Sequence, residues 1–95
     1  MIIANGSLAL PLEAAPLRLS LRVWDGRISE IASSLSPLPG EETVDASGLL
    51  VLPGAIDPHV HFDEPGFTER EDFLHGSAEA ARGGVTTVID MPCTS

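Results

Sequence analysis

The order of elements over residues 55–91 constrains the fold of this chain more than any other feature. Residues 55–62 and 85–91 are typical of buried strands, and residues 71–82 between them carry apolar side chains at helical spacing. A strand, a helix and a strand in this order predict a βαβ unit with two parallel strands. One such unit cannot close a barrel or bury its own sheet, so we expect it to begin a larger α/β fold.

The first half of the chain predicts a β-hairpin. Leu17–Trp24 alternates apolar and polar residues with the two-residue period of a half-buried strand. Asp25-Gly26 follows, and residues 27–31 alternate again. A strand, Asp-Gly and a second strand are the pattern of a tight hairpin.

Shorter strands are expected on either side of this hairpin. The apolar run of residues 1–4 should end in a turn at Asn5-Gly6, a strong turn pair. Val44 and residues 49–52 indicate further short strands. The sequence therefore predicts several antiparallel strands before the βαβ unit.

Composition limits the class of partner and the compartment. The net charge is −9, from 14 acids against 5 basic residues, which argues against nucleic-acid and anionic membrane partners. The single cysteine excludes an internal disulfide framework and fits a reducing compartment. The sequence shows neither a signal peptide nor an apolar run of membrane-spanning length, so we expect a soluble cytoplasmic protein.

His59 and His61 are the central chemical feature. Residues two apart in a strand point to the same side, so these rings are predicted to aim together, as two ligands of one metal ion do. They end their strand at the edge where barrel active sites are assembled. Asp57, on the same face, is a candidate to orient a ligand histidine.

A metal site is one of two interpretations of this pair, because two histidines at this spacing also occur without any metal and a site needs three or four ligands. Cys93 is predicted to point toward the same end of the sheet. It is a candidate metal ligand, a substrate contact, or a small buried residue, which is the usual role of a lone cysteine.

The second half of the chain resembles the opening of the cyclic amidohydrolases, the group of dihydroorotases, allantoinases and hydantoinases. The matching segments are Pro53-Gly54-Ala55-Ile56-Asp57, His59 with His61, Glu64-Pro65-Gly66, Gly83-Gly84-Val85-Thr86-Thr87 and Met91-Pro92. The first half is similar, more loosely, to the small β-sandwich that flanks the barrel in that family. The resemblance implies an α/β fold, with part of the β-sandwich in residues 1–54 and the first βαβ unit of a metal-dependent TIM barrel in residues 55–95.

The resemblance also implies roles for single residues. His59 and His61 would bind the more buried of two metal ions, usually zinc, and Asp57 would be structural or support a ligand. Asp63 and Cys93 stand where dihydroorotases carry an arginine and an asparagine that contact substrate. An acid at position 63 would repel a substrate carboxylate, so these departures argue against a standard dihydroorotase and fit an allantoinase somewhat better.

The remaining machinery of that family is a carboxylated lysine that bridges the metals, two later histidines and a late aspartate base. This chain has no lysine, so we expect no catalytic residue in it, and the 95 residues alone are predicted to be inactive. His75 is interpreted as a surface or packing residue, and Asp90 receives no role. The resemblance implies that the parent protein is a homo-oligomeric hydrolase of small cyclic amides with two zinc ions.

Two other functions stay open at this point. One is a non-catalytic relative, or partner subunit, that is retained for assembly with an enzyme. The other is a free-standing β-rich binding module, which ranks lowest because the final βαβ unit would expose both faces of its strands. A lysine and two histidines encoded beyond residue 95 would favour the hydrolase, and their loss would favour the non-catalytic relative.

Overall fold

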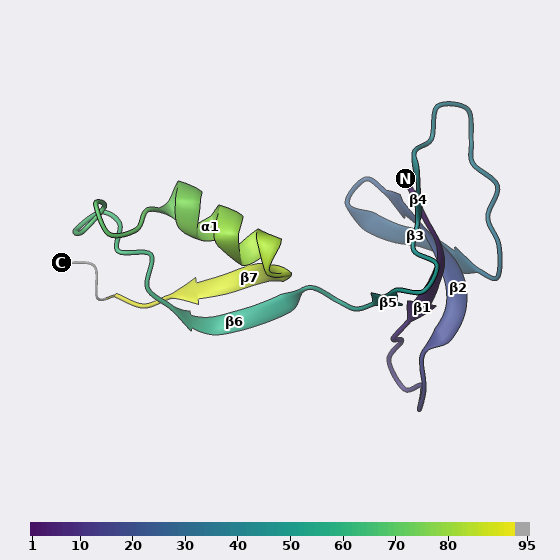
Figure 1. Cartoon of the computed structure of the whole chain (residues 1–95), viewed down its shortest axis with the longest axis horizontal. Coiled ribbons are helices and arrows are strands. Elements are labelled where there is room, and N and C mark those ends of the chain that lie inside the picture. The colour runs from purple at the N-terminus through teal and green to yellow at the C-terminus, as the bar shows by residue number, and fades with distance from the viewer. Residues whose placement is uncertain (93–95) are drawn as a thin grey trace. The chain divides into compact units, whose positions relative to one another are not determined.

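The computed structural model describes residues 1–92, and these divide into two compact units, one up to Pro53 and the other from Gly54 on (Figure 1). The units meet one residue before the boundary expected at 54/55, and their assignment to two domains of a larger protein stays a prediction. Over residues 1–92, we find no helix that combines the length and the apolar character needed to cross a membrane.

The N-terminal unit is a five-stranded sheet, and its hairpin prediction is confirmed. Strands β2 (Leu17–Trp24) and β3 (Arg27–Ala32) pair antiparallel. Asp25 and Gly26 between them have φ values of 51° and 71°. Two left-handed residues in a two-residue loop match the twist of paired strands, which is why Asp-Gly specifies this turn.

The expectation of purely antiparallel strands is wrong for the rest of this sheet. Strand β1 (Ile2–Leu8) pairs antiparallel with β2, but β4 (Thr43–Asp45) and β5 (Leu50–Val51) both pair with β1 in parallel. The strand order is β3-β2-β1-β4, with β5 also on β1. The long segment between β3 and β4 returns the chain to the start of β1, and such a connection permits parallel pairing where a tight turn does not.

The turn predicted at Asn5-Gly6 is also wrong, because β1 continues through it. Asn5 adopts a φ of 61°, and the register with β2 shifts between Ile3 and Gly6, which marks a β-bulge. The buried Ser20 Oγ accepts a hydrogen bond from the Asn5 N–H at 3.0 Å. An ideal Cβ on Gly6 would lie 2.5 Å from Val51 Cγ2, so the site has room only for glycine. The Asn-Gly pair therefore supports a bulge here.

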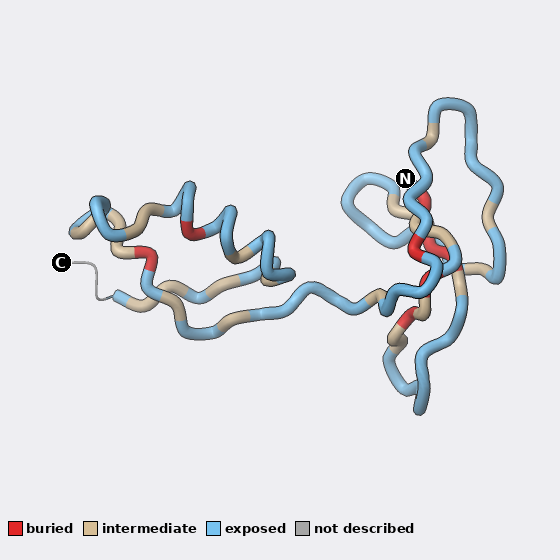
Figure 2. The backbone as a smooth tube through the Cα atoms, in the orientation of Figure 1, coloured by how far each residue is buried: buried red, intermediate tan, exposed pale blue. Residues whose placement is uncertain are grey.

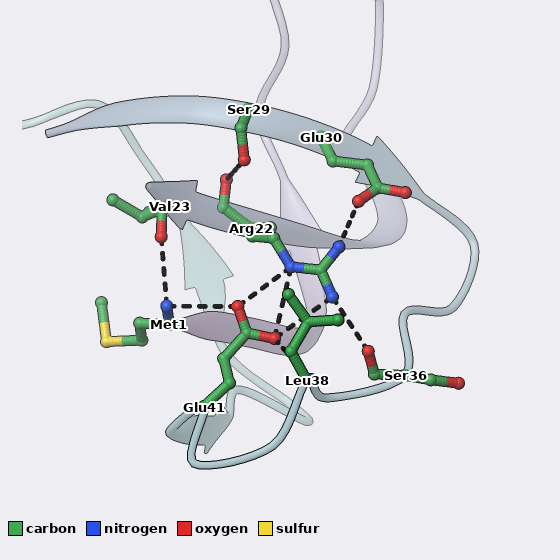
Figure 3. A network of polar contacts seen from close by, with 8 residues as sticks. All are labelled: Met1, Arg22, Val23, Ser29, Glu30, Ser36, Leu38 and Glu41. Carbon is green, nitrogen blue, oxygen red and sulfur yellow. Dashed lines mark hydrogen bonds and ion pairs between the residues drawn. The ribbon is translucent and has the colours of Figure 1, made fainter. Parts of the chain in front are cut away.

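The N-terminal unit also contains a network of polar contacts centred on Arg22 of β2 (Figure 3). Arg22 donates two parallel hydrogen bonds to Glu41, from Nε to Oε2 at 3.0 Å and from Nη2 to Oε1 at 3.1 Å. It also pairs with Glu30 and donates to the Ser36 carbonyl. The Arg22 guanidinium and the Leu38 N–H hold the pKa of Glu41 at about 2. These bonds attach the segment before β4 to β2.

The C-terminal unit is the predicted βαβ. Strand β6 (Ala55–Val60) pairs in parallel with β7 (Val85–Asp90), and α1 (Phe73–Arg82) connects them. Pairing is irregular between Asp57 and Val60, where Pro58 has no N–H to donate. The predicted α/β class with one βαβ unit is confirmed.

Helix α1 begins at Phe73, two residues later than expected, because Asp72 caps it. The Asp72 Oδ1 accepts from the His75 N–H at 2.7 Å, which satisfies one of the free amides of the first turn. At the other end, Gly83 is the C-cap, and Gly84 after it adopts a φ of 88°, a conformation that favours glycine.

Most of the C-terminal unit is exposed or half-buried (Figure 2), and its buried residues among those described are Phe62 and Gly76. The Phe62 side chain is 7% exposed and packs edge-on against Phe73, with ring centroids 5.7 Å apart. An ideal Cβ on Gly76 would lie 2.8 Å from the Phe62 ring. The mid-helix glycine, unfavourable by propensity alone, is therefore explained by this close contact.

Candidate metal centre at the end of β6

The structure brings the two histidine rings together. The Nε2 atoms of His59 and His61 are 3.2 Å apart, and the ring centroids are 5.2 Å apart. Both side chains are exposed. At this distance one neutral imidazole can donate its N–H to the other, or both lone pairs can face one cation.

The spacing of the Nε2 atoms fits a metal. Zinc holds imidazole nitrogens at about 2.0–2.1 Å in a tetrahedron, which places two of them about 3.3 Å apart. Within residues 1–92, no group of three or more histidine, cysteine, aspartate or glutamate side chains is arranged around one point. His59 and His61 therefore offer two nitrogen donors, fewer than the three or four protein ligands of a zinc site, and their role as ligands stays a prediction.

Asp57 contacts the backbone of His59 and not an imidazole nitrogen. Its Oδ1 accepts from the His59 N–H at 3.1 Å, across Pro58. This bond gives a partner to an amide that the irregular β6–β7 pairing leaves outside the ladder. Asp57 thus fixes the backbone that carries the first histidine, and its predicted support of a ligand would act through that backbone.

Phe62, directly after the second histidine, is bonded to the neighbouring strand by a contact that sequence reasoning missed. The Phe62 N–H donates to the Asp90 Oδ1 at 3.0 Å. Asp90 ends β7 and is half-buried. Two residues separated by 28 positions leave no local signal in the sequence. The one available signal is that Asp90, an acid, ends the strand expected to pair with the histidine-bearing strand.

The structure says less about the two predicted substrate contacts, Asp63 and Cys93. Asp63 is half-buried with a φ of 57°, and its carbonyl accepts from the Phe67 N–H, so it opens the turn after the histidines. No structural observation tests whether the Asp63 carboxylate contacts substrate, so that role stays a prediction. Cys93 lies outside the described residues.

Two further residues of the region support α1. The Glu64 Oε2 accepts from the Phe73 N–H at 2.7 Å, so this carboxylate shares the capping of the helix with Asp72. His75 is exposed, and its Nδ1 lies 2.8 Å from the Asp72 Oδ1. The His75 backbone N–H, followed by its ring, lowers the pKa of Asp72. Glu64 and Asp72 thus act on the helix N-terminus, where negative charge is stabilising.

Comparison with known proteins places these residues in a family. A sequence model of the amidohydrolase family matches residues 50–95. A dihydroorotase of Streptococcus pneumoniae is 45% identical over 100% of this chain and 22% of its own length. An allantoinase of Escherichia coli is 40% identical over 97% of this chain and 19% of its own length. A crystal structure of a D-hydantoinase superposes with a TM-score of 0.80 at 40% identity, over 94% of this chain and 19% of that one.

These comparisons support the fold beyond the βαβ unit. The chain spans about a fifth of the length of the relatives it matches, and in the hydantoinase structures a β-sandwich stands before the TIM barrel. The predicted class, a flanking β-sandwich followed by the first unit of a barrel, is confirmed.

Proposed function

The chain belongs to the amidohydrolase family, and we propose that the whole protein is a metal-dependent hydrolase that opens cyclic amide rings. The observation that carries the proposal is the 3.2 Å separation of the Nε2 atoms of His59 and His61 at the end of β6. The names of the relatives, dihydroorotase, allantoinase and hydantoinase, support the substrate class.

Membership of the family implies a metal, and we propose that His59 and His61 bind it through Nε2. Each ring must then carry its proton on Nδ1, so that the Nε2 lone pair is free. Asp57 holds the His59 backbone in place for this. When bound, the metal supplies a Lewis acid that polarises the amide carbonyl and activates water near neutral pH.

Zinc is the proposed metal, because imidazole nitrogen is a donor that suits zinc and similar borderline ions. A second zinc, with a carboxylated lysine between the two ions, would need ligands from elsewhere in the whole protein, since this chain has no lysine. For the same reason we expect residues 1–95 alone to bind zinc weakly and to hydrolyse no cyclic amide.

We propose that Asp63 and Cys93 contact the substrate. A carboxylate at position 63 repels an acidic group on the ring, so the preferred substrate is a neutral cyclic amide. Replacing Asp63 with Asn should then relax discrimination against carboxylated rings more than it changes turnover of neutral ones.

The charge of these 95 residues and the nature of the relatives suggest a setting for the whole protein. We propose a cytoplasmic homo-oligomer that acts on a small molecule without nucleic-acid or membrane partners. The net charge of −9 on these 95 residues supports the last point, because phosphate surfaces would repel this part of the protein.

The test uses the whole protein and a panel of cyclic amides with and without a ring carboxylate. We expect hydrolysis that a chelator abolishes and added zinc restores, and that is lost in His59→Ala and His61→Ala. His75→Ala is the matched control, since this exposed histidine bonds only to Asp72 among the described residues, and it should keep activity. Full activity in the doubly substituted His59/His61 variant would contradict the proposal, and metal binding without any turnover would favour the non-catalytic relative.

A further inference from the structure

The end of β6 is held to β7 by a side chain. The last backbone bond between the strands runs from the Met91 N–H to the Val60 carbonyl at 2.8 Å. The next bond across the same edge joins the Phe62 N–H to the Asp90 carboxylate at 3.0 Å. A carboxylate acceptor makes a stronger hydrogen bond than a neutral carbonyl, so this contact extends the pairing past the strand end.

Phe62 is fixed on its other side by α1. Its buried ring packs edge-on against Phe73 and leaves no room for a Cβ on Gly76. The residue directly after His61 is thus bound through its backbone to β7 and through its ring to the helix. Neither contact involves an imidazole.

The two histidines are therefore oriented through their backbones. The His59 N–H donates to Asp57, and the residue after His61 donates to Asp90. Among the described residues, the side-chain hydrogen bond of His61 goes only to the His59 ring. The orientation of the His61 ring therefore depends on the backbone between Val60 and Phe62. One end of this segment is bonded to Met91 and the other to the Asp90 carboxylate.

We infer that Asp90 is a positioning residue for the metal-binding pair: by accepting the Phe62 N–H it keeps the His61 Nε2 beside the His59 Nε2. The inference rests on the proposed function. If Asp90 only closed the β6–β7 pairing, its loss would lower stability but leave the metal affinity of the folded protein unchanged.

The test compares metal binding in variants of the whole protein with its metal removed. Co²⁺ alone is the probe, titrated by its visible absorption, with hydrogen exchange of the segment around Phe62 as a second readout. Asp90→Ala should weaken Co²⁺ binding by about 10- to 100-fold, change the absorption spectrum and speed exchange at Phe62. Glu79→Ala removes one negative charge from an exposed position on α1 and should change none of the three.

Two further variants decide the matter if Asp90→Ala does not fold. Asp90→Asn keeps an oxygen acceptor in place without the charge and should bind Co²⁺ nearly as the unsubstituted protein does. Asp90→Glu keeps the charge but moves the acceptor by one methylene, and should bind more weakly.

Equal Co²⁺ affinity and spectra in folded Asp90→Ala and Glu79→Ala, or equal affinities of Asp90→Asn and Asp90→Glu, would overturn the inference and leave the proposed function standing. Absence of Co²⁺ binding by the unsubstituted protein, or equal binding by a variant without His59 and His61, would overturn both.

Discussion

The two units of this chain differ in how many large apolar side chains they bury, and both leave others exposed. In the N-terminal unit, Ile2, Leu8 and Leu21 are almost fully buried, while Trp24 is 70% exposed. Among the described residues of the C-terminal unit, Phe62 is the large buried side chain, while Ile56 and Leu74 are 67% and 73% exposed. A mixed sheet with a tight hairpin can cover one face within some 50 residues, whereas parallel strands normally need elements on both faces. The chemistry of the proposed site therefore lies on the unit with the weaker internal packing.

The largest expected effect of this contrast is on hydrogen exchange in the 95-residue chain. Amides of β1 and β2 should exchange on the order of 100-fold more slowly than those of β6 and β7, because few buried contacts oppose local opening of the second unit. Exchange followed by mass spectrometry or NMR measures this difference. Equal protection of the two units would break the comparison.

Replacing a leucine with alanine in each unit tests the contrast with the same change at one buried and one exposed position. Leu21→Ala removes a buried side chain, and we expect the free energy of unfolding of the N-terminal unit to fall by about 2–5 kcal/mol. Leu74→Ala, on the exposed face of α1, should change the stability of its unit by less than about 0.5 kcal/mol. Denaturant unfolding, followed by Trp24 fluorescence and by helix circular dichroism respectively, reports the two units. A large loss in Leu74→Ala would show that this face is covered.

Adding one methyl group at Gly76 tests the packing within the C-terminal unit. Gly76→Ala should destabilise it by about 1–3 kcal/mol through overpacking against Phe62, although alanine favours helix by about 1 kcal/mol. The control is Ser77→Ala, at the exposed neighbouring position, which should have little effect. Thermal melting by circular dichroism compares them, and a stabilised Gly76→Ala would contradict the close contact.

The smallest effect concerns pH and the N-terminal unit. Because Arg22 lowers the pKa of Glu41 from 4.5 to about 2, the stability from this pair is present above pH 4.5 and is lost as pH falls toward 2. Glu41→Gln should lower the denaturation midpoint at pH 6 and flatten its decline in acid. Glu42→Gln, at the exposed neighbour, is the control, and Trp24 fluorescence measures both. An unchanged acid profile in Glu41→Gln would count against the pair.

Local turn chemistry explains which parts of the fold the sequence could predict. Asp25-Gly26 lies between two alternating runs, so the turn and its hairpin follow from a few adjacent residues. Asn5-Gly6 carries an equally strong local signal, but its outcome depends on Ser20 and Val51, which are distant in sequence. The parallel pairing of β4 and β5 with β1 is non-local in the same way.

The features of the candidate site also separate into those set by neighbouring residues and those set by residues distant in sequence. The convergence of His59 and His61 follows from the two-residue period of a strand, which is a local property. The roles of Asp90 and Gly76 depend on which segments the βαβ unit brings to Phe62, and no spacing rule gives them. Pro58 cannot donate to the β6–β7 ladder, and Asp57 compensates for the irregular pairing by accepting the His59 N–H.

The bare backbone of α1 at Gly76 has a consequence for distances between elements. With no side chain between them, the thickness of one aromatic ring sets how closely the helix approaches the chain that follows β6. A larger residue at position 76 or a smaller one at position 62 would reset that separation. The Phe62 ring therefore acts as a spacer between α1 and the end of β6. The position of the helix relative to the histidines at that strand end depends on the size of this one side chain.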